Sequence, residues 1–493
     1  AQVMAWPVES DDNVPIALWD SGAVADAVGG VASGEFLISG VAIDSREVVG
    51  GDLFIALKGE AMDGHRFVAG AQDKGAAALV EQDFDGLTIR AEDSFAALQA
   101  LGRAARARVS ADAVIIGVTG SVGKTSVKEA LFAALDRSSR GAAHRSVKSY
   151  NNHVGVPLSL ARMPARSKFG IFEMGMNHAG EIAALTTQVR PHIAVITTIA
   201  PAHIEMLGSE EAIADAKAEI FAGLEAGGTA IIPADSPHYL RLRSAAEAVG
   251  AKIVSFGVAD HADVRLLDAV GAVGGGSLVT MEMGAESGFA RRLCYTISAA
   301  GEHWVVNSLA VMAAVRAAGG DLGAAGLALA EMAGMAGRGA RTQIATKDGG
   351  RAVLIDESYN ANPASMRASL AVLAATPAKR RIAVLGAMKE LGDFGPGLHA
   401  ALAEPVRHAG VDFALLVGDE MAALATELGK AGGGSLGNGF DFAQCSSALA
   451  ARDILADFGL RDGDAVLIKG SNSVGLGALV AALSQTVPPQ NGS

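Results

Sequence analysis

The hydrophobic and polar positions of the chain alternate between short apolar runs and longer amphipathic stretches. The clearest example starts at residues 114–118, which are apolar or glycine and predict a buried parallel strand. A glycine-containing loop, 119–125, comes next, and from Ser126 onward apolar residues recur at helical spacing. The pattern predicts a strand, a loop and a helix in this order, and we expect the other elements to be arranged around them.

The same alternation precedes this segment on a smaller scale and predicts a small α/β domain. Two polar clusters, Asp44-Ser45-Arg46 and Asp63-Gly64-His65, lie in loops between the predicted elements, where ligand contacts usually occur. On spacing alone, ordinary surface loops explain them equally well. The predicted elements are helices at 16–28 and 67–74 and strands at 36–44, 53–57 and 77–80.

After the glycine loop the pattern continues with parallel strands and then changes in type. From 253 to 297, apolar residues alternate in short runs around the turn Gly274-Gly275-Gly276, which predicts an antiparallel sheet added to the parallel core. Gly337-Arg338-Gly339 indicates a hinge, so we place a domain boundary there. The other elements predicted here are strands at 168–173 and 193–198 and helices at 94–108, 209–224, 305–318 and 322–332.

Strand and helix patterns alternate again in the last third and predict a second doubly wound domain, without a P-loop. Its most polar segment, 356–363, follows the first strand, a position where such folds bind ligands. The predicted elements are strands at 352–355, 381–385, 413–417 and 465–468 and helices at 366–373, 398–408, 420–428, 448–458 and from 476 onward.

Length and pattern together predict an α/β protein of three domains, because 493 residues are too many for one core. We expect a small α/β domain at 1–90. A central P-loop domain at 91–338 has a doubly wound parallel sheet with added antiparallel strands. A Rossmann-like α/β domain follows at 339–493.

Composition and charge exclude several classes of protein. Half of the residues are apolar, which is typical of a globular chain, and the net charge of −13 argues against nucleic acid as the main partner. Cys294 and Cys445 match no metal-site spacing and indicate reduced, buried thiols in a cytoplasmic protein. No apolar run is long enough to span a bilayer, so we expect no membrane insertion.

The glycine loop has the residue types that hold a triphosphate at P-loop spacing. Gly120 and Gly123 would let backbone N–H groups approach the phosphates, while Lys124 would neutralise their charge. Thr125 would bind Mg²⁺. Val118 stands where the motif has its first glycine, so a plain turn before a helix is the alternative, which the predicted strand and helix disfavour.

Three further side chains have positions that suit a magnesium site. Glu173 ends a predicted strand, as does the acidic residue that positions Mg²⁺ in P-loop domains, and His203 follows the next strand. A solvent-exposed carboxylate and a structural histidine are the alternatives. Lys217, taken alone, is explained as a solvated residue of its helix.

Taken together, these segments resemble the Mur ligase family, the ATP-dependent amide ligases of peptidoglycan precursor synthesis, over nearly the whole chain. The loop T-G-S-V-G-K-T-S at 119–126 is similar to the P-loop variant of that family, which accounts for the displaced glycine. Asn151-Asn152, Glu173 and His203 also occur in family order. Lys217 matches a lysine that the family carbamylates to obtain a further magnesium ligand.

Three segments are similar to the branch of the family that adds D-alanyl-D-alanine to the UDP-N-acetylmuramoyl tripeptide. Asp44-Ser45-Arg46 resembles the UDP-binding domain of this branch and of the diamino-acid-adding branch. D-E-S-Y-N-A-N-P at 356–363 and L-G-A-M-K-E-L-G at 385–392 resemble the first branch alone. Ala387 and Glu357 depart from the pattern, since the family usually has Asp at these positions.

The resemblance implies an ADP-forming ligase that joins D-alanyl-D-alanine to UDP-N-acetylmuramoyl-tripeptide through an acyl phosphate, in cell wall biogenesis and cell division. It also implies ATP and two Mg²⁺ ions, N6-carboxylysine at Lys217, a cytoplasmic location and a monomer. The implied residues are Lys124, Lys217 and His203 for catalysis; Thr125, Glu173, His203 and carbamylated Lys217 for metal; Gly120, Ser121, Val122, Gly123, Lys124, Thr125, Ser126, Asn307, Arg338, Asp356, Tyr359 and Asn360 for ATP; and Asp44, Ser45, Arg46, Lys58, Asp63, His65, Asn151 and Asn152 for the UDP-linked substrate.

Other functions remain as alternatives. A diamino-acid-adding Mur ligase is disfavoured because its D-N-P-R signature is absent, and a folyl-polyglutamate ligase is disfavoured by the domain that contains Asp44 and His65. A P-loop kinase or nucleotide switch would leave the flanking segments unexplained. The segment most similar to a guanine-recognition motif is Thr346-Lys347-Asp348-Gly349, and it lacks the final Asp of that motif.

Overall fold

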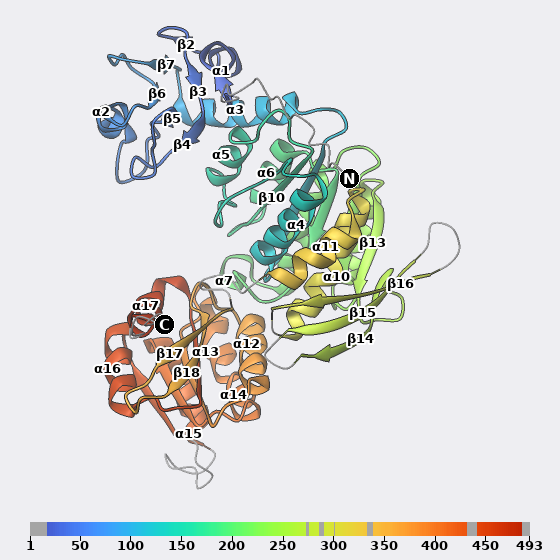
Figure 1. The fold of residues 1–493 in the computed structure, drawn as a ribbon, viewed down its shortest axis with the longest axis vertical. Helices are drawn as coiled ribbons and strands as arrows, with labels where there is room; N and C mark the ends of the chain where they lie inside the picture. Colours follow the sequence, from blue (N-terminus) through green and yellow to red (C-terminus); the bar gives the residue numbers. More distant parts are fainter. Residues whose placement is uncertain are drawn as a thin grey trace, which may run out of the picture. The chain divides into compact units, whose positions relative to one another are not determined.

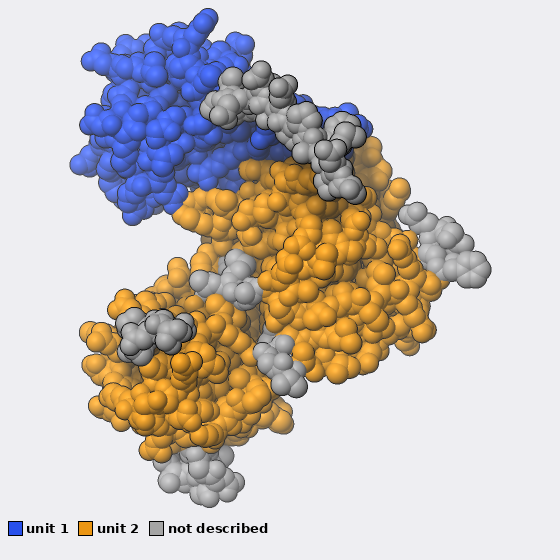
Figure 2. All heavy atoms as spheres, viewed as in Figure 1, with its two compact units in different colours: residues 1–112, 153–167 blue, residues 113–152, 168–493 orange. Residues whose placement is uncertain are grey.

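A computed structural model describes residues 17–272, 276–284, 290–299, 301–332, 339–430 and 441–485. The chain divides into two compact units (Figure 2): unit 1 is Ala1–Asp112 with His153–Ser167, and unit 2 is Ala113–Asn152 with Lys168–Ser493. Gly274, Gly275, Gly337 and Arg338, on which the expected turn and hinge depend, lie outside the described residues. The boundaries at 90 and 338 stay predictions.

Unit 1 is built on a sheet in the order β2-β7-β6-β5-β4. Its elements are β1 Trp19–Asp20, α1 Ser21–Val28, β2 Val31–Ala32, β3 Leu37–Ile38, β4 Gly40–Ala42, β5 Asp52–Ile55, η1 Gly64–Phe67, α2 Val68–Asp73, β6 Ala77–Val80, β7 Thr88–Arg90, α3 Ser94–Arg108 and α5 Gly155–Ala161. β4 to β7 are parallel, so their carboxyl ends meet at one edge. α5 packs against α3, where a Cβ at Gly102 would lie 3.0 Å from the Pro157 carbonyl oxygen.

The larger sheet of unit 2 has the order β16-β15-β14-β13-β12-β11-β8-β10-β9. Its strands and the surrounding helices are β8 Val114–Thr119, α4 Lys124–Ser138, β9 Ala143–Arg145, β10 Phe169–Glu173, α6 Glu181–Val189, β11 Ile193–Ile196, α7 Ile204–Leu207, α8 Glu210–Ala218, η2 Glu219–Gly223, β12 Thr229–Pro233, α9 Tyr239–Ala248, β13 Lys252–Gly257, β14 Val264–Gly271, β15 Ser277–Met283, β16 Arg291–Ile297, α10 Glu302–Ala317 and α11 Leu322–Glu331.

β8 lies between β10 and β11 and is followed by the glycine loop. The connection from β8 leads to β9, and that from its neighbour β11 leads to β12 on the opposite side, so the carboxyl ends of β8 and β11 form a switch point, the usual ligand position in such sheets. α4, α10 and α11 pack together on one face (Figure 1), and Val127, Leu131 and Leu135 of α4 are fully buried in that core. The expectation of an antiparallel sheet from 253 onward is wrong for β13, which is parallel to both β12 and β14; the antiparallel pairs are β14 with β15 and β15 with β16.

The smaller sheet of unit 2 has the order β17-β18-β22-β19-β20-β21, parallel except for β17. Its elements are β17 Ala340–Ala345, β18 Arg351–Glu357, α12 Pro363–Ala375, β19 Arg380–Gly386, η3 Gly392–Phe394, α13 Gly395–Ala400, α14 Ala403–His408, β20 Phe413–Val417, η4 Asp419–Met421, α15 Ala422–Gly429, β21 Asp441–Cys445, α16 Ala448–Phe458, β22 Asp464–Lys469, η5 Asn472–Val474 and α17 Gly477–Ser484. One helix was expected at 398–408, and the structure has two, α13 and α14. The expectation that both cysteines are buried is wrong: Cys294 is exposed and Cys445 is half-buried, because each lies on an edge strand, β16 and β21.

Candidate active site

The loop between β8 and α4 is held so tightly that two of its positions accept only glycine. Gly120 has a φ of +149°, and a Cβ there would lie 1.9 Å from Thr197 Oγ1. Gly123 has a φ of +86°, and a Cβ there would lie 2.8 Å from Asn307 Nδ2. The Thr197 hydroxyl also donates to the Val122 carbonyl at 2.5 Å. Glycine is needed at both positions for the positive φ and for the close approach of neighbouring atoms, as in a phosphate-binding loop.

A residue that the sequence analysis did not assign also contacts this loop. Asn362 caps the N-terminus of α12 through a capping box with Ser365, and its Nδ2 lies 3.4 Å from the Ser121 carbonyl oxygen. The capping pattern is visible in the sequence, but the contact with Ser121 joins residues 241 positions apart. The polar segment after β18 therefore reaches the P-loop through Asn362.

Thr125 and Glu173 meet at the carboxyl ends of neighbouring strands. Thr125 is in the first turn of α4, and its hydroxyl donates to the Glu173 carboxylate, with 3.0 and 2.9 Å to the two oxygens. Asn151 Nδ2 donates to Glu173 Oε1 at 2.9 Å. Glu173 is 1% exposed, so this carboxylate is buried and depends on these donors. The predicted metal residues Thr125 and Glu173 are thus adjacent, with Asn151 beside them.

Lys217, at the end of α8, is fully buried, contrary to what its helix alone suggested. Its Nζ has no hydrogen-bond partner within the described residues. The pKa of Lys217 lies well below its usual value of 10.5, chiefly because of burial and then because of the positive charge of Lys124, with Glu173 acting in the opposite direction. Burial and the positive charge of Lys124 therefore both disfavour the protonated form of this side chain.

Lys217→Met is expected to raise the free energy of unfolding at neutral pH in CO₂-free buffer. Between the lowered pKa of the folded state and 10.5, the unfolded chain binds a proton that the folded chain does not. Wild-type stability consequently falls as the pH decreases from 10.5 through this window, and the advantage of methionine shrinks as the pH rises toward 10.5. Chemical denaturation at several pH values measures this. An advantage independent of pH would contradict a neutral buried amine.

His203 lies just before α7 with a φ of +61°, an unusual backbone for a residue other than glycine. Its Nδ1 contacts the carboxylate of Glu390, which follows β19, and the hydrogen bond from His203 lowers the pKa of the Glu390 carboxyl. Glu390 also has a positive φ, +63°, and its carbonyl accepts from the Glu205 N–H at 3.1 Å. His203 is therefore oriented by the C-terminal sheet, and its role as a metal ligand stays a prediction.

The remaining predicted ATP residues belong to α10 and to the segment after β18. Asn307 is buried beneath Gly123, as described above. Asp356 Oδ1 accepts from the Ser358 N–H and hydroxyl, at 3.1 and 2.6 Å. The Asn360 carbonyl accepts from Lys469 Nζ at 3.0 Å, and Tyr359 is 39% exposed. Arg338 lies outside the described residues.

Unit 1 holds most of the residues predicted for the UDP-linked substrate. Asp44 and Arg46 form a bidentate pair after β4, with 2.7 Å between Arg46 Nη2 and Asp44 Oδ2, and the Ser45 carbonyl accepts from Lys74 Nζ at 2.9 Å. Arg46 is 87% exposed, so its guanidinium is accessible to an anionic ligand. Asn151 and Asn152 belong to unit 2.

Lys58, Asp63 and His65 form a second polar group in unit 1, together with Glu81, which the sequence analysis missed. His65 Nδ1 lies 2.7 Å from Asp63 Oδ1, and Nε2 accepts from the Glu81 N–H at 3.0 Å, which places the ring proton on Nδ1. A hydrogen bond from Lys58 lowers the pKa of the Glu81 carboxyl. Glu81 follows β6 directly, so its position at the carboxyl edge could have been inferred from the strand pattern.

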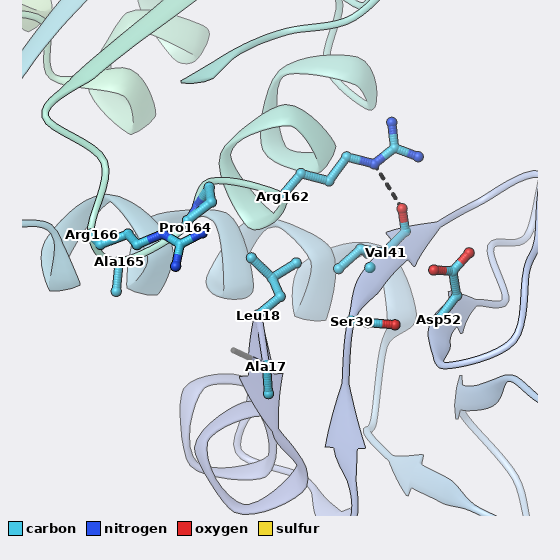
Figure 3. A pocket seen from close by; sticks show the side chains of 10 residues that line it. Ala17, Leu18, Ser39, Val41, Asp52, Arg162, Pro164, Ala165 and Arg166 are labelled. Atoms are coloured by element: carbon cyan, nitrogen blue, oxygen red, sulfur yellow. Dashed lines mark hydrogen bonds between the residues drawn. The ribbon is translucent and has the colours of Figure 1, made fainter. Parts of the chain in front are cut away.

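A cavity of about 470 Å³ in unit 1 lies elsewhere (Figure 3). It includes Ser39, Gly40 and Asp52, at the amino ends of β4 and β5, whereas the predicted UDP residues follow the carboxyl ends of these strands. Arg162 lines it and donates from Nε to the Val41 carbonyl at 2.7 Å. The cavity is therefore separate from the predicted substrate residues.

Comparison with known proteins agrees with this arrangement. Three family models match the chain: the catalytic domain of the Mur ligase family at residues 37–123, the Mur ligase middle domain at 118–315, and the Mur ligase glutamate ligase domain at 340–472. The chain belongs to the Mur ligase family. In this Mur ligase the phosphate-binding loop and Glu173 lie within the middle-domain match, and the segment after β18 lies within the glutamate ligase match.

Individual Mur ligases align with nearly the whole chain. UDP-N-acetylmuramoyl-tripeptide–D-alanyl-D-alanine ligases from Synechocystis and Escherichia coli are 37% and 32% identical to it, over 92% and 93% of this chain and 93% and 96% of theirs. A crystal structure of MurF from Acinetobacter baumannii superposes with a TM-score of 0.79 at 29% identity, covering 96% of this chain and 100% of that chain. MurF from Thermotoga maritima in complex with ADP gives 0.72 at 25% identity, covering 91% and 97%.

These findings confirm the predicted family, the three-domain α/β fold class and the enzyme class, an ATP-dependent, ADP-forming ligase. The use of ATP is confirmed by the family and by the ADP complex of a relative. In the part of the chain that the structure describes, no helix is long and apolar enough to cross a membrane.

Proposed function

We propose that this Mur ligase joins D-alanyl-D-alanine to UDP-N-acetylmuramoyl-tripeptide and cleaves ATP to ADP and phosphate. The observation that carries the proposal is the whole-length similarity to relatives with this name, which extends over both segments that distinguish the branch, 356–363 and 385–392. We also propose a cytoplasmic, monomeric enzyme with a substrate domain at 1–90, an ATP-binding domain at 91–338 and a third domain at 339–493.

The proposed reaction has two steps. A carboxylate oxygen of the tripeptide attacks the γ-phosphorus of ATP, the bond to the β,γ-bridging oxygen breaks, and an acyl phosphate and ADP form. The amine of D-alanyl-D-alanine then attacks the acyl carbon, loses a proton, and displaces phosphate. Both steps bring anions together, so the protein must neutralise charge and exclude water.

We assign the phosphates to the loop between β8 and α4. Its backbone N–H groups, at the start of α4, would bind the phosphate oxygens, and Lys124 would neutralise them. The donors come from Gly120 to Ser126, including Ser121 and Val122. Asn307, Asp356, Tyr359 and Asn360 would contact the rest of the nucleotide, and Asp44 to Arg46, Lys58, Asp63, His65, Asn151 and Asn152 the UDP-linked substrate.

We assign Mg²⁺ to Thr125, Glu173, His203 and a carbamylated Lys217. No cluster of three or more His, Cys, Asp or Glu side chains that could hold a metal occurs in the described ranges. This suits Mg²⁺, which keeps several waters and binds through one or two carboxylates plus substrate phosphates. When bound, Mg²⁺ would offset phosphate charge. The buried amine of Lys217, which has no hydrogen-bond partner among the described residues, is a group that carbamylation would turn into a second carboxylate.

Phosphate release from ATP tests the function. The assay contains UDP-N-acetylmuramoyl-tripeptide, with either diaminopimelate or lysine as third residue, and one amine at a time: D-alanyl-D-alanine, D-alanine, diaminopimelate, lysine or glutamate. We expect release with D-alanyl-D-alanine only. Release with a free diamino acid, or with glutamate on a folate acceptor, would instead place the enzyme in another branch of the ligases.

A further inference from the structure

Lys128 is a fully buried lysine that the proposed reaction does not use. It lies one helical turn after Lys124 on α4. Its Nζ donates to the Lys148 carbonyl at 2.6 Å and lies 3.2 Å from Glu129 Oε1 and 3.7 Å from Glu173 Oε2. A charge with no exposed surface is costly unless it is paired and hydrogen-bonded, so these contacts are what keep the ammonium group inside.

The turn that Lys128 contacts has an unfavourable backbone. Lys148 has a φ of +52°, in the left-handed region that residues other than glycine rarely occupy. Such a conformation persists only when surrounding contacts impose it, and the hydrogen bond from Lys128 acts directly on the Lys148 carbonyl. Removing this donor leaves the turn free to relax.

The loop that starts at this turn ends at Asn151. The Asn151 carbonyl accepts from the Gly175 N–H at 2.8 Å, and its side chain donates to Glu173, as described above. Lys128 therefore holds the start of the loop at Lys148, and β10 with the residues that follow it holds the end of the loop at Asn151. Because the ammonium group also lies near Glu173, one cation joins the loop to the proposed metal ligand.

We propose that Lys128 is a positioning residue that fixes the Lys148 turn and thereby sets Asn151 and Asn152 for the UDP-linked substrate. The inference rests on the proposed function for the identity of that substrate. It separates two lysines of one helix: Lys124 faces the nucleotide phosphates, and Lys128 orders the loop of the other substrate.

Two variants test this. Lys128→Met removes the donor and the charge but keeps the length, whereas Lys128→Gln keeps an N–H donor for the Lys148 carbonyl. For Lys128→Met we expect the KM for UDP-N-acetylmuramoyl-tripeptide to rise about tenfold, with the KM for ATP and kcat changed less than about twofold, as loss of one charge-assisted hydrogen bond predicts. Lys128→Gln should restore most of the KM.

Hydrogen exchange of the amides in 147–152, measured without substrates, gives a readout that does not depend on activity. It should accelerate in Lys128→Met and return toward wild type in Lys128→Gln. Lys168→Met, an exposed lysine in the same unit, is the control and should change neither quantity. Unchanged KM and exchange in Lys128→Met would overturn the proposal. So would a Lys128→Gln variant whose kcat and KM change as much as those of Lys128→Met. A wild type without activity on the tripeptide would instead contradict the proposed function, and the exchange comparison would still decide the role of Lys128.

Discussion

Lys217→Ala is expected to lose about two to three orders of magnitude of phosphate release and to regain part of it when acetate or formate is added. The physical reason is the environment of this side chain. Its amine is fully buried and has no hydrogen-bond partner in the described structure, and its pKa is lowered by burial and by Lys124. A neutral amine is the form that reacts with CO₂, and the resulting carbamate would add a second negative charge to that of Glu173. A small carboxylate could take its place in the space that alanine leaves.

The measurement is phosphate release from ATP at saturating substrates, with and without the added carboxylate. Lys252→Ala, an exposed lysine on β13, is the matched control and should keep wild-type activity with or without acetate. Mass spectrometry of the intact wild type at high bicarbonate should show an added CO₂ that Lys217→Ala does not bind. Full activity of Lys217→Ala would remove Lys217 from the site. Loss without any rescue would favour a role for the amine itself.

The strand, loop and helix around the P-loop could be predicted because each carries a local signal. The apolar run at 114–118 became β8, the helical pattern became α4, and the glycines have the backbone geometry that the motif requires. Strand direction is a different matter. Alternation of apolar residues indicates a half-buried strand but not its neighbour, so β13 was assigned to the antiparallel part although it pairs with β12 in parallel.

Edge strands were missed for a related reason. β17 and β21 lie at the two edges of the smaller sheet of unit 2, and each has one neighbouring strand. Their sequences, A-R-T-Q-I-A and D-F-A-Q-C, contain polar residues because an edge strand is only partly buried. Their hydrophobic signal is correspondingly weak. The central strands β20 and β22, which are fully buried, were found within one residue of their ends.

The burial of side chains in the site could likewise not be predicted from local sequence patterns. A lysine on an amphipathic helix is usually solvated, and neither Lys217 nor Lys128 has a local signal that says otherwise. Both are buried because strands and helices distant in sequence close over them, which only the folded structure reveals. Resemblance to the Mur ligases identified Lys217 but gave no reason to select Lys128 or Asn362. Residues whose role depends on contacts between distant parts of the sequence can therefore be identified only from the structure.

Glu173→Gln is expected to lower kcat by about two to three orders of magnitude and to raise the Mg²⁺ concentration needed for half-maximal activity. Glutamine keeps the size of the side chain and an oxygen that can accept from Thr125 or Asn151, so the buried contacts can largely persist. The negative charge is lost. If Glu173 holds Mg²⁺ beside the P-loop, the loss acts on the metal first and on the phosphates through it, so excess Mg²⁺ should recover part of kcat.

Calorimetric titration of ADP with and without Mg²⁺ separates these effects. In the wild type Mg²⁺ should strengthen ADP binding, and in Glu173→Gln this gain should disappear while metal-free binding stays close to wild type, because the loop N–H groups and Lys124 are untouched. Glu247→Gln, an exposed carboxylate on α9 that pairs with Arg243, is the control and should keep the full gain. A Glu173→Gln enzyme with the wild-type Mg²⁺ requirement would show that the carboxylate serves only to hold Thr125 and Asn151. The metal would then have to be held by His203 and Lys217, which makes the Lys217→Ala result the deciding comparison.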